Sequence, residues 1–234
     1  TITIVDPVLL PMTFESLTVN YDFINFGGGQ VTVLNNPQKS GINTSNRVGR
    51  MVKNAPEPWG GSVITLGAPI NFSSNKIFTM KVYSPRVGAR VLLKVENLTD
   101  GGVFFEREAT STVANAWEEL GFDFSAINTS NSYQKVVLIF DLGTPGDGSA
   151  NFTWLFDDIR LTNSLPDNQL KLPVTFESAT INYAFTNFGN ATSTVVNNPQ
   201  VNAGNASAKV GRLNKANGAE VWAGSFLELA TPIN

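Results

Sequence analysis

Short segments of the chain alternate apolar and polar residues, as strands with one buried face do. In one of them, Val91, Leu93 and Val95 share a face, while Arg90 and Lys94 belong to the opposite face. Clusters of Gly, Asn, Pro and Asp bound such segments, which predict strands at residues 77–83, 89–96, 103–108, 117–124, 135–141 and 152–161. No stretch has a sustained helical period, so the pattern predicts an all-β sandwich.

One long segment occurs twice. Residues 12–50 recur at residues 174–212, with 22 of 39 positions identical at a constant offset of 162. After a shift of one residue the likeness continues, and Trp222 stands in the second copy where Trp59 stands in the first. Repetition at a fixed period predicts tandem modules, here with an incomplete second copy. The expected parts are the end of a preceding module or a linker (1–11), a complete module (12–162), a linker (163–173) and the first part of a second module (174–234).

The composition removes several kinds of chemistry. The 234-residue chain has no Cys and no His, which excludes thiolate and imidazole nucleophiles, Ser/His/Asp triads and metal sites built on soft ligands. Its net charge of −3 and the lack of basic runs interleaved with aromatic residues argue against a nucleic-acid partner. No apolar run approaches the length of a membrane span. We therefore expect neither nucleic acid nor a membrane span.

Two acids predict a cation site. Strict alternation places Asp157 on the apolar side of the last predicted strand, with Ile159 and Leu161, and turns Asp158 outward. An ionised carboxylate on a core face needs a partner. Glu15, in the opening strand of the module, is a second acid among apolar residues. If the two meet at the rim of the sandwich, a hard cation such as Ca²⁺ would join them; alternatively, both are exposed at strand ends.

Three segments together resemble a known family. Thr13-Phe14-Glu15, the loop at 41–48 and the closing Phe-Asp-Asp-Ile at 156–159 look like the pattern of calcium-containing jelly-roll carbohydrate-binding modules. The likeness is greatest to the family 4 type and to repeats of secreted or surface glycan-binding proteins of Bacteroidetes, and it covers residues 12–162. It implies a jelly-roll β-sandwich with a structural calcium ion. By this resemblance the ligands are the side chains of Glu15 and Asp157 and the backbone carbonyls of Thr13, Thr44 and Arg47.

A sugar site needs an exposed flat aromatic ring and a few polar side chains, because sugars present apolar C–H faces ringed by hydroxyls. Trp59 is the candidate, since the glycines that follow it leave its face uncovered, and Trp222 is its counterpart. Arg90 and Lys94, on the polar face of a strand, could donate hydrogen bonds. The alternatives are that Trp59 packs beneath its loop as core and that the two basic residues form an ordinary solvated face.

Hydrolysis is not expected. A glycosidase needs a carboxylic acid of raised pKa and an ionised carboxylate on either side of a cleft. Glu106 and Glu108 share a face but lie beside Arg107 and exposed turns, and the adjacent acids elsewhere point to opposite faces of their strands.

These observations together predict an extracellular or cell-surface array of calcium-stabilised, non-catalytic β-sandwich modules. They would bind polysaccharide and contact neighbouring modules of the same array. One alternative is a structural or adhesive repeat of a surface protein or filament, without a sugar site. Another is an accessory region joined to a catalytic domain.

Overall fold

A computed structural model describes residues 6–166, 170–178 and 181–229. The chain divides into two compact units, unit 1 (Thr1–Pro166) and unit 2 (Asp167–Asn234). Within the described residues, no helix has the length and apolar character needed to cross a membrane.

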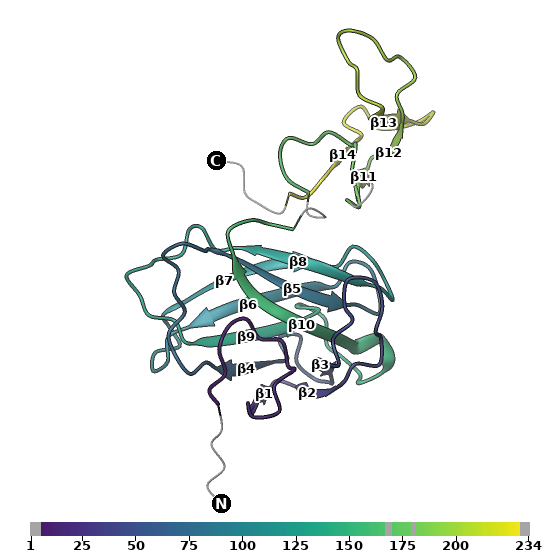
Figure 1. The fold of residues 1–234 in the computed structure, drawn as a ribbon. Coiled ribbons are helices and arrows are strands. Elements are labelled where there is room, and N and C mark those ends of the chain that lie inside the picture. The colour runs from purple at the N-terminus through teal and green to yellow at the C-terminus, as the bar shows by residue number, and fades with distance from the viewer. Residues whose placement is uncertain (1–5, 167–169, 179–180, 230–234) are drawn as a thin grey trace, which may run out of the picture. The chain divides into compact units, whose positions relative to one another are not determined.

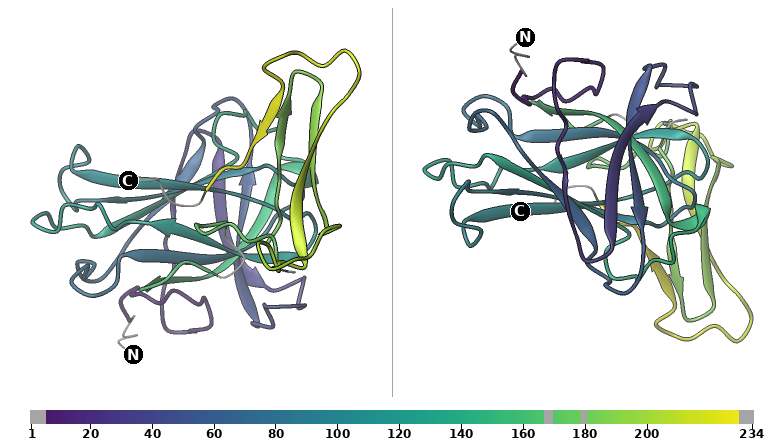
Figure 2. Two further views of the ribbon diagram at one scale, coloured as in Figure 1. Left: turned by 90° about the horizontal axis from the view of Figure 1, so that it is seen from above. Right: turned by 90° about the horizontal axis from the view of Figure 1, so that it is seen from below.

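Unit 1 consists of two five-stranded antiparallel sheets (Figure 1 and Figure 2). Sheet I has the order β1-β4-β9-β6-β7, with β1 (Ile24–Phe26), β4 (Gly61–Thr65), β9 (Lys135–Phe140), β6 (Arg90–Glu96) and β7 (Phe104–Thr110). Sheet II has the order β2-β3-β10-β5-β8, with β2 (Gly29–Asn35), β3 (Arg47–Lys53), β10 (Thr153–Thr162), β5 (Ile77–Tyr83) and β8 (Trp117–Asp123). A single 3-10 turn (Ala150–Phe152) precedes β10. The predicted β-sandwich is confirmed.

The core lies between the two sheets, where the alternating side chains of both inner faces meet. Val91, Leu93 and Val95 of β6 are fully buried, as their alternation predicted. From sheet II, Phe156 packs against Phe140 of sheet I with ring centroids 5.5 Å apart. The apolar face of each strand is thus the face that points into the core between the two sheets.

The last strand departs from the prediction. Its core side chains include Phe156 and Ile159, which strict alternation would place on opposite faces. The register against β5 shifts between Asp157 and Arg160, and Asp158 has a φ of 55°, so the strand contains a β-bulge. The predicted placement of Asp157 on the same side as Ile159 is therefore wrong. In the strand register Asp157 lies opposite Lys81, on the outer side of sheet II, while the Lys81 ammonium forms its ion pair with Asp158.

A small apolar cluster covers part of that outer side. Val48, Trp117 and Leu155 pack together there, apart from the main core. The Trp117 indole N–H donates to the Gln38 carbonyl at 2.6 Å, which ties the loop after β2 to the edge strand β8. Trp117 is thus a structural residue.

Residues 6–11 pack onto unit 1. Val8 is buried in the main core, its carbonyl accepts the Gly67 N–H at 2.8 Å, and the Asp6 N–H donates to the Thr18 carbonyl at 3.0 Å. The region that the sequence analysis takes as a preceding module or linker therefore contributes core to this unit.

Within its described residues, unit 2 contains two two-stranded sheets, β11 (Thr186–Phe188) with β14 (Gly224–Phe226) and β12 (Ala191–Asn197) with β13 (Lys209–Lys215). Its pairings match those of unit 1, since Phe188 pairs with Gly224 as Phe26 pairs with Gly61. Its side chains are more exposed. Leu213 is 51% exposed, whereas Met51, at the same position of the repeat, is 0% exposed.

We predict that Gly49→Ala destabilises unit 1 by roughly 1–3 kcal/mol, the usual range for overpacking a core. A methyl group at Gly49 would come within 2.4 Å of the buried Phe156 ring. The urea unfolding midpoint measures the change. Gly101→Ala is the control, because the nearest atom to its added methyl group is Glu96 Oε2 at 3.9 Å. Equal midpoints for the two variants would contradict the packing described.

Candidate functional site

The outer face of sheet I gathers side chains from all five strands. Strand pairing forms one row of Ile24, Val63, Val137, Lys94 and Glu106 across the sheet. On one side of this row lie Phe26, Ile139, Leu92 and Glu108, and on the other lie Thr65, Lys135, Glu96 and Phe104. Adjacent strands are ~4.8 Å apart, so the face extends ~19 Å from β1 to β7. It has an apolar middle and charged side chains toward β7.

Trp59 lies at the β1 edge of this face. Its ring stacks on Phe26 with centroids 6.2 Å apart and an interplanar angle of 21°. It also lies over Gly27, where a Cβ would come within 2.7 Å of the indole. Trp59 is nevertheless 48% exposed. The alternative that it packs beneath its loop as core does not match this position, since nearly half of the residue meets solvent.

The same aromatic pair occurs in unit 2. Trp222 stacks on Phe188 with centroids 6.1 Å apart and an angle of 13°, and it is 62% exposed. Gly189 lies under the ring as Gly27 does in unit 1. Sequence reasoning missed Phe26 and Phe188, although both lie in the repeated segment, ten positions after the Ser of a shared Phe-Glu-Ser.

The two predicted basic residues lie on the outer face, toward β7. Arg90 pairs with Glu108 at 2.6 Å, and Lys94 pairs with Glu96 at 2.8 Å. The Lys94 ammonium also lies 4.1 Å from the ring centroid of Phe104, which is 45% exposed. Phe104, a further aromatic residue on this face, was missed by sequence reasoning, although it alternates with Glu106 and Glu108 along β7.

Charge on the outer face is balanced. Its basic side chains are Arg90, Lys94 and Lys135, and its acidic side chains are Glu96, Glu106 and Glu108. Glu96 and Glu108 are held in ion pairs. The arrangement offers both donors and acceptors of hydrogen bonds without an excess of either sign of charge.

A second candidate site is formed where one loop donates hydrogen bonds to both Glu15 and Asp157. The Asn46 side-chain amide and the Arg47 backbone N–H donate to Glu15 at 3.1 and 2.8 Å. Three residues earlier, the side-chain amide of the buried Asn43 donates to Asp157 at 3.0 Å. Both acids therefore contact one short loop, although they are 142 positions apart in the sequence.

The chemistry of this second site fits a hard cation. Asp157 is 0% exposed, and burial raises its pKa, against hydrogen bonds from Ser45, the Asp158 N–H and Asn43. Within the described part of the chain, Lys81 and Arg160 pair with Asp158 and no base pairs with Asp157. A buried carboxylate without a cation is costly, and oxygen ligands suit Ca²⁺. No cluster of three or more Asp, Glu, His or Cys occurs among the described residues, so other ligands would be neutral oxygens.

Thr13, Thr44 and Arg47, the implied carbonyl ligands, each lie within two positions of Glu15, Asn43 or Asn46 in the sequence. Thr13 lies two residues before Glu15 and is half-buried, while Thr44 is exposed next to the buried Asn43. Arg47 meets Glu15 through its N–H and not through its carbonyl. The role of these three residues stays a prediction.

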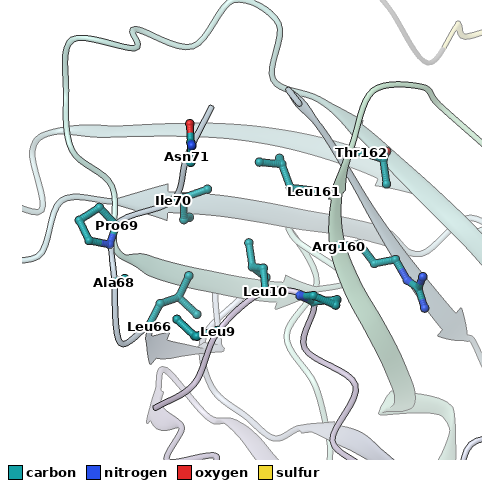
Figure 3. A pocket seen from close by; sticks show the side chains of 11 residues that line it. Leu9, Leu10, Leu66, Ala68, Pro69, Ile70, Asn71, Arg160, Leu161 and Thr162 are labelled. Carbon is teal, nitrogen blue, oxygen red and sulfur yellow. The ribbon is translucent and has the colours of Figure 1, made fainter. Parts of the chain in front are cut away.

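A pocket of about 460 Å³ lies elsewhere in unit 1, lined by residues 9–11, 66, 68–71 and 160–162. Leu10, Ile70 and Leu161 point into it, while Arg160 extends away (Figure 3). Its lining has no aromatic ring and none of the predicted site residues. It therefore offers no stacking surface for a sugar.

No protein-family model matches the sequence, and no curated protein is similar to it. Solved structures with a similar fold include carbohydrate-binding modules. The family 11 module of Clostridium thermocellum, in complex with a β-1,3-1,4-mixed-linked tetrasaccharide, has a TM-score of 0.46 and 13% identity, covering 65% of this chain and 94% of that chain. The xylan-binding CBM22-2 domain of Paenibacillus barcinonensis has a TM-score of 0.42 and 14% identity, covering 65% and 98%.

An exo-β-agarase reaches a TM-score of 0.50 at 13% identity, over 74% of this chain and 28% of that chain. At such identities the likeness shows the fold alone. The β-sandwich part of the predicted resemblance is confirmed by the two sheets of unit 1, whereas the family 4 type, the calcium ion and the link to Bacteroidetes proteins stay predictions.

Proposed function

We propose that unit 1 is a non-catalytic carbohydrate-binding module of an extracellular, multimodular protein, and that it binds a polysaccharide on the outer face of sheet I. One observation carries the proposal. The exposed Trp59–Phe26 stack shares this face with a charge-balanced set of polar side chains.

Binding would combine two interactions. The exposed face of Trp59 would take the C–H face of a sugar ring, and the ion-paired side chains of Arg90 and Lys94 would hydrogen-bond hydroxyls farther along the chain. A face ~19 Å wide accommodates several sugar units, with Phe104 at the far edge. Equal numbers of acids and bases favour a neutral polysaccharide over a charged one. Trp222 is the corresponding aromatic residue of unit 2.

We further propose that Glu15 and Asp157 hold a structural Ca²⁺ ion, with neutral oxygens from the neighbourhood of Thr13, Thr44 and Arg47. When bound, the ion supplies positive charge beside the buried Asp157. Because the ion would join the start of the unit to its last strand, its role is stability and not sugar contact.

We predict that Trp59→Ala weakens binding to a neutral polysaccharide at least tenfold, or about 1.4 kcal/mol, because the stacking surface is lost. Affinity electrophoresis over a panel of neutral and acidic polysaccharides measures this. Trp117→Phe is the control, since Trp117 packs on the outer side of sheet II. If the unaltered chain binds nothing in the panel, the structural or adhesive repeat becomes the better account.

For the ion, we predict that a calcium chelator lowers the melting temperature by several degrees, because a ligand bound only to the folded state stabilises it. Calorimetry with and without chelator measures the shift. Glu15→Gln should remove the chelator effect, whereas Glu106→Gln, an exposed acid on sheet I, should keep it. A melting temperature unchanged by chelation in the unaltered chain would exclude the calcium site.

A further inference from the structure

Lys53 is a buried base that the proposed sugar contacts do not use. It ends β3, and it is 0% exposed. Its ammonium group donates to the backbone carbonyls of Pro58 at 2.7 Å, Phe140 at 3.0 Å and Asp141 at 2.7 Å. A lysine ammonium has three donors and no acceptor, so each donor has one carbonyl.

These three carbonyls belong to two segments beside the outer face of sheet I. Pro58 directly precedes Trp59, and its carbonyl also accepts the Gly143 N–H at 3.1 Å. Phe140 and Asp141 lie where β9 ends. One charge therefore ties a strand of sheet II both to the Trp59 loop and to the end of the central strand of sheet I.

The loop after β9 closes around the same lysine. The Gly148 N–H donates to the Lys53 carbonyl at 2.9 Å. Gly146 lies so close that a Cβ there would be 2.0 Å from the Lys53 carbonyl oxygen. This close packing keeps the ammonium group in place and away from water.

Two charged groups face Lys53. Burial lowers the pKa of its ammonium to about 8; the Asp141 carboxylate acts to raise it and the Arg86 guanidinium to lower it further. Arg86 in turn pairs with Asp141. At neutral pH Lys53 is therefore mostly protonated, with its three donors in use.

The contact with the Trp loop occurs twice. Lys215 stands in unit 2 where Lys53 stands in unit 1, and it donates to the Val221 carbonyl at 2.9 Å. Val221 directly precedes Trp222. In both units, then, a lysine at the end of a strand binds the carbonyl just before the stacked tryptophan.

We propose that Lys53 is a positioning residue for carbohydrate binding: it fixes the backbone before Trp59 so that the indole stays stacked on Phe26 and presents its free face. This inference rests on the proposed function for its consequence in binding. The anchoring of Trp59 is testable without any sugar.

The test is Lys53→Met in the full chain, which keeps the length of the side chain and removes the donors. The carbonyls of Pro58, Phe140 and Asp141 would each lose the lysine donor, and we expect the Trp59 loop to shift as a result. We expect the Trp59 indole ¹H–¹⁵N resonance, assigned with Trp59→Phe, to shift. We also expect affinity for a polysaccharide that the unaltered chain binds to fall at least tenfold. Trp117→Phe lowers stability on the other sheet and should change neither.

Failure of the proposed function and failure of the positioning role of Lys53 would give different results. If the unaltered chain binds no polysaccharide, the proposed function fails, and the indole resonance still decides the role of Lys53. An unshifted resonance together with full affinity in Lys53→Met would overturn the positioning role. Should that variant not fold, Lys215→Met provides the same test at an exposed position, where an unmoved Trp222 resonance would count against the proposal.

A pH experiment examines Lys53 independently. The pKa of about 8 lies below the ordinary 10.5, so between these values the unfolded chain binds a proton that the folded chain has released. The free energy of unfolding should therefore rise with pH across this window through Lys53. Urea midpoints at pH 8 and pH 10 measure the rise, and Lys53→Met should show a smaller one. Identical pH dependence in both chains would contradict the burial of an ionisable Lys53.

Discussion

The insertion of β10 between β3 and β5 is the constraint on which the rest of unit 1 depends. It places Phe156 in the core beside Gly49, and the paired backbone bonds between Ile159 and Met12, at 2.9 and 3.0 Å, bring the start of the unit to its last strand. As the central strand of sheet II, β10 is hydrogen-bonded along both of its edges, to β3 and to β5. Because β10 lies in this position, Glu15 and Asp157 contact the same loop, and the two sheets enclose one core.

Much of this fold is predictable from the sequence, because most strands obey strict alternation. The strand predicted at 77–83 is β5 to the residue, and the faces of β6 are as expected. The bulge at Asp158 could not be predicted from alternation, because alternation assumes an unbroken register. The positive φ of Asp158 occurs where β10 pairs both with β5 and with Met12. The packing of Val8 into the core likewise depends on a long-range contact with Gly67.

The candidate site was predictable in part. Glycines after Trp59 indicated an uncovered ring, and alternation placed Arg90 and Lys94 on the polar face. Lys53 was not predictable, because a lysine at a strand end ordinarily extends into water. Only the tertiary structure brings three carbonyls of other segments to its ammonium group.

The stacking of Trp59 on Phe26 has a further consequence for recognition. An indole that already rests on a neighbouring ring and on the backbone of Gly27 has few rotamers left to lose when a ligand arrives. A side chain that is already fixed before binding loses little conformational entropy on binding, and this raises affinity without additional contacts. In the proposed function, such a surface would suit repeated weak encounters along a long polymer, with each tryptophan attaching and releasing without refolding of its loop.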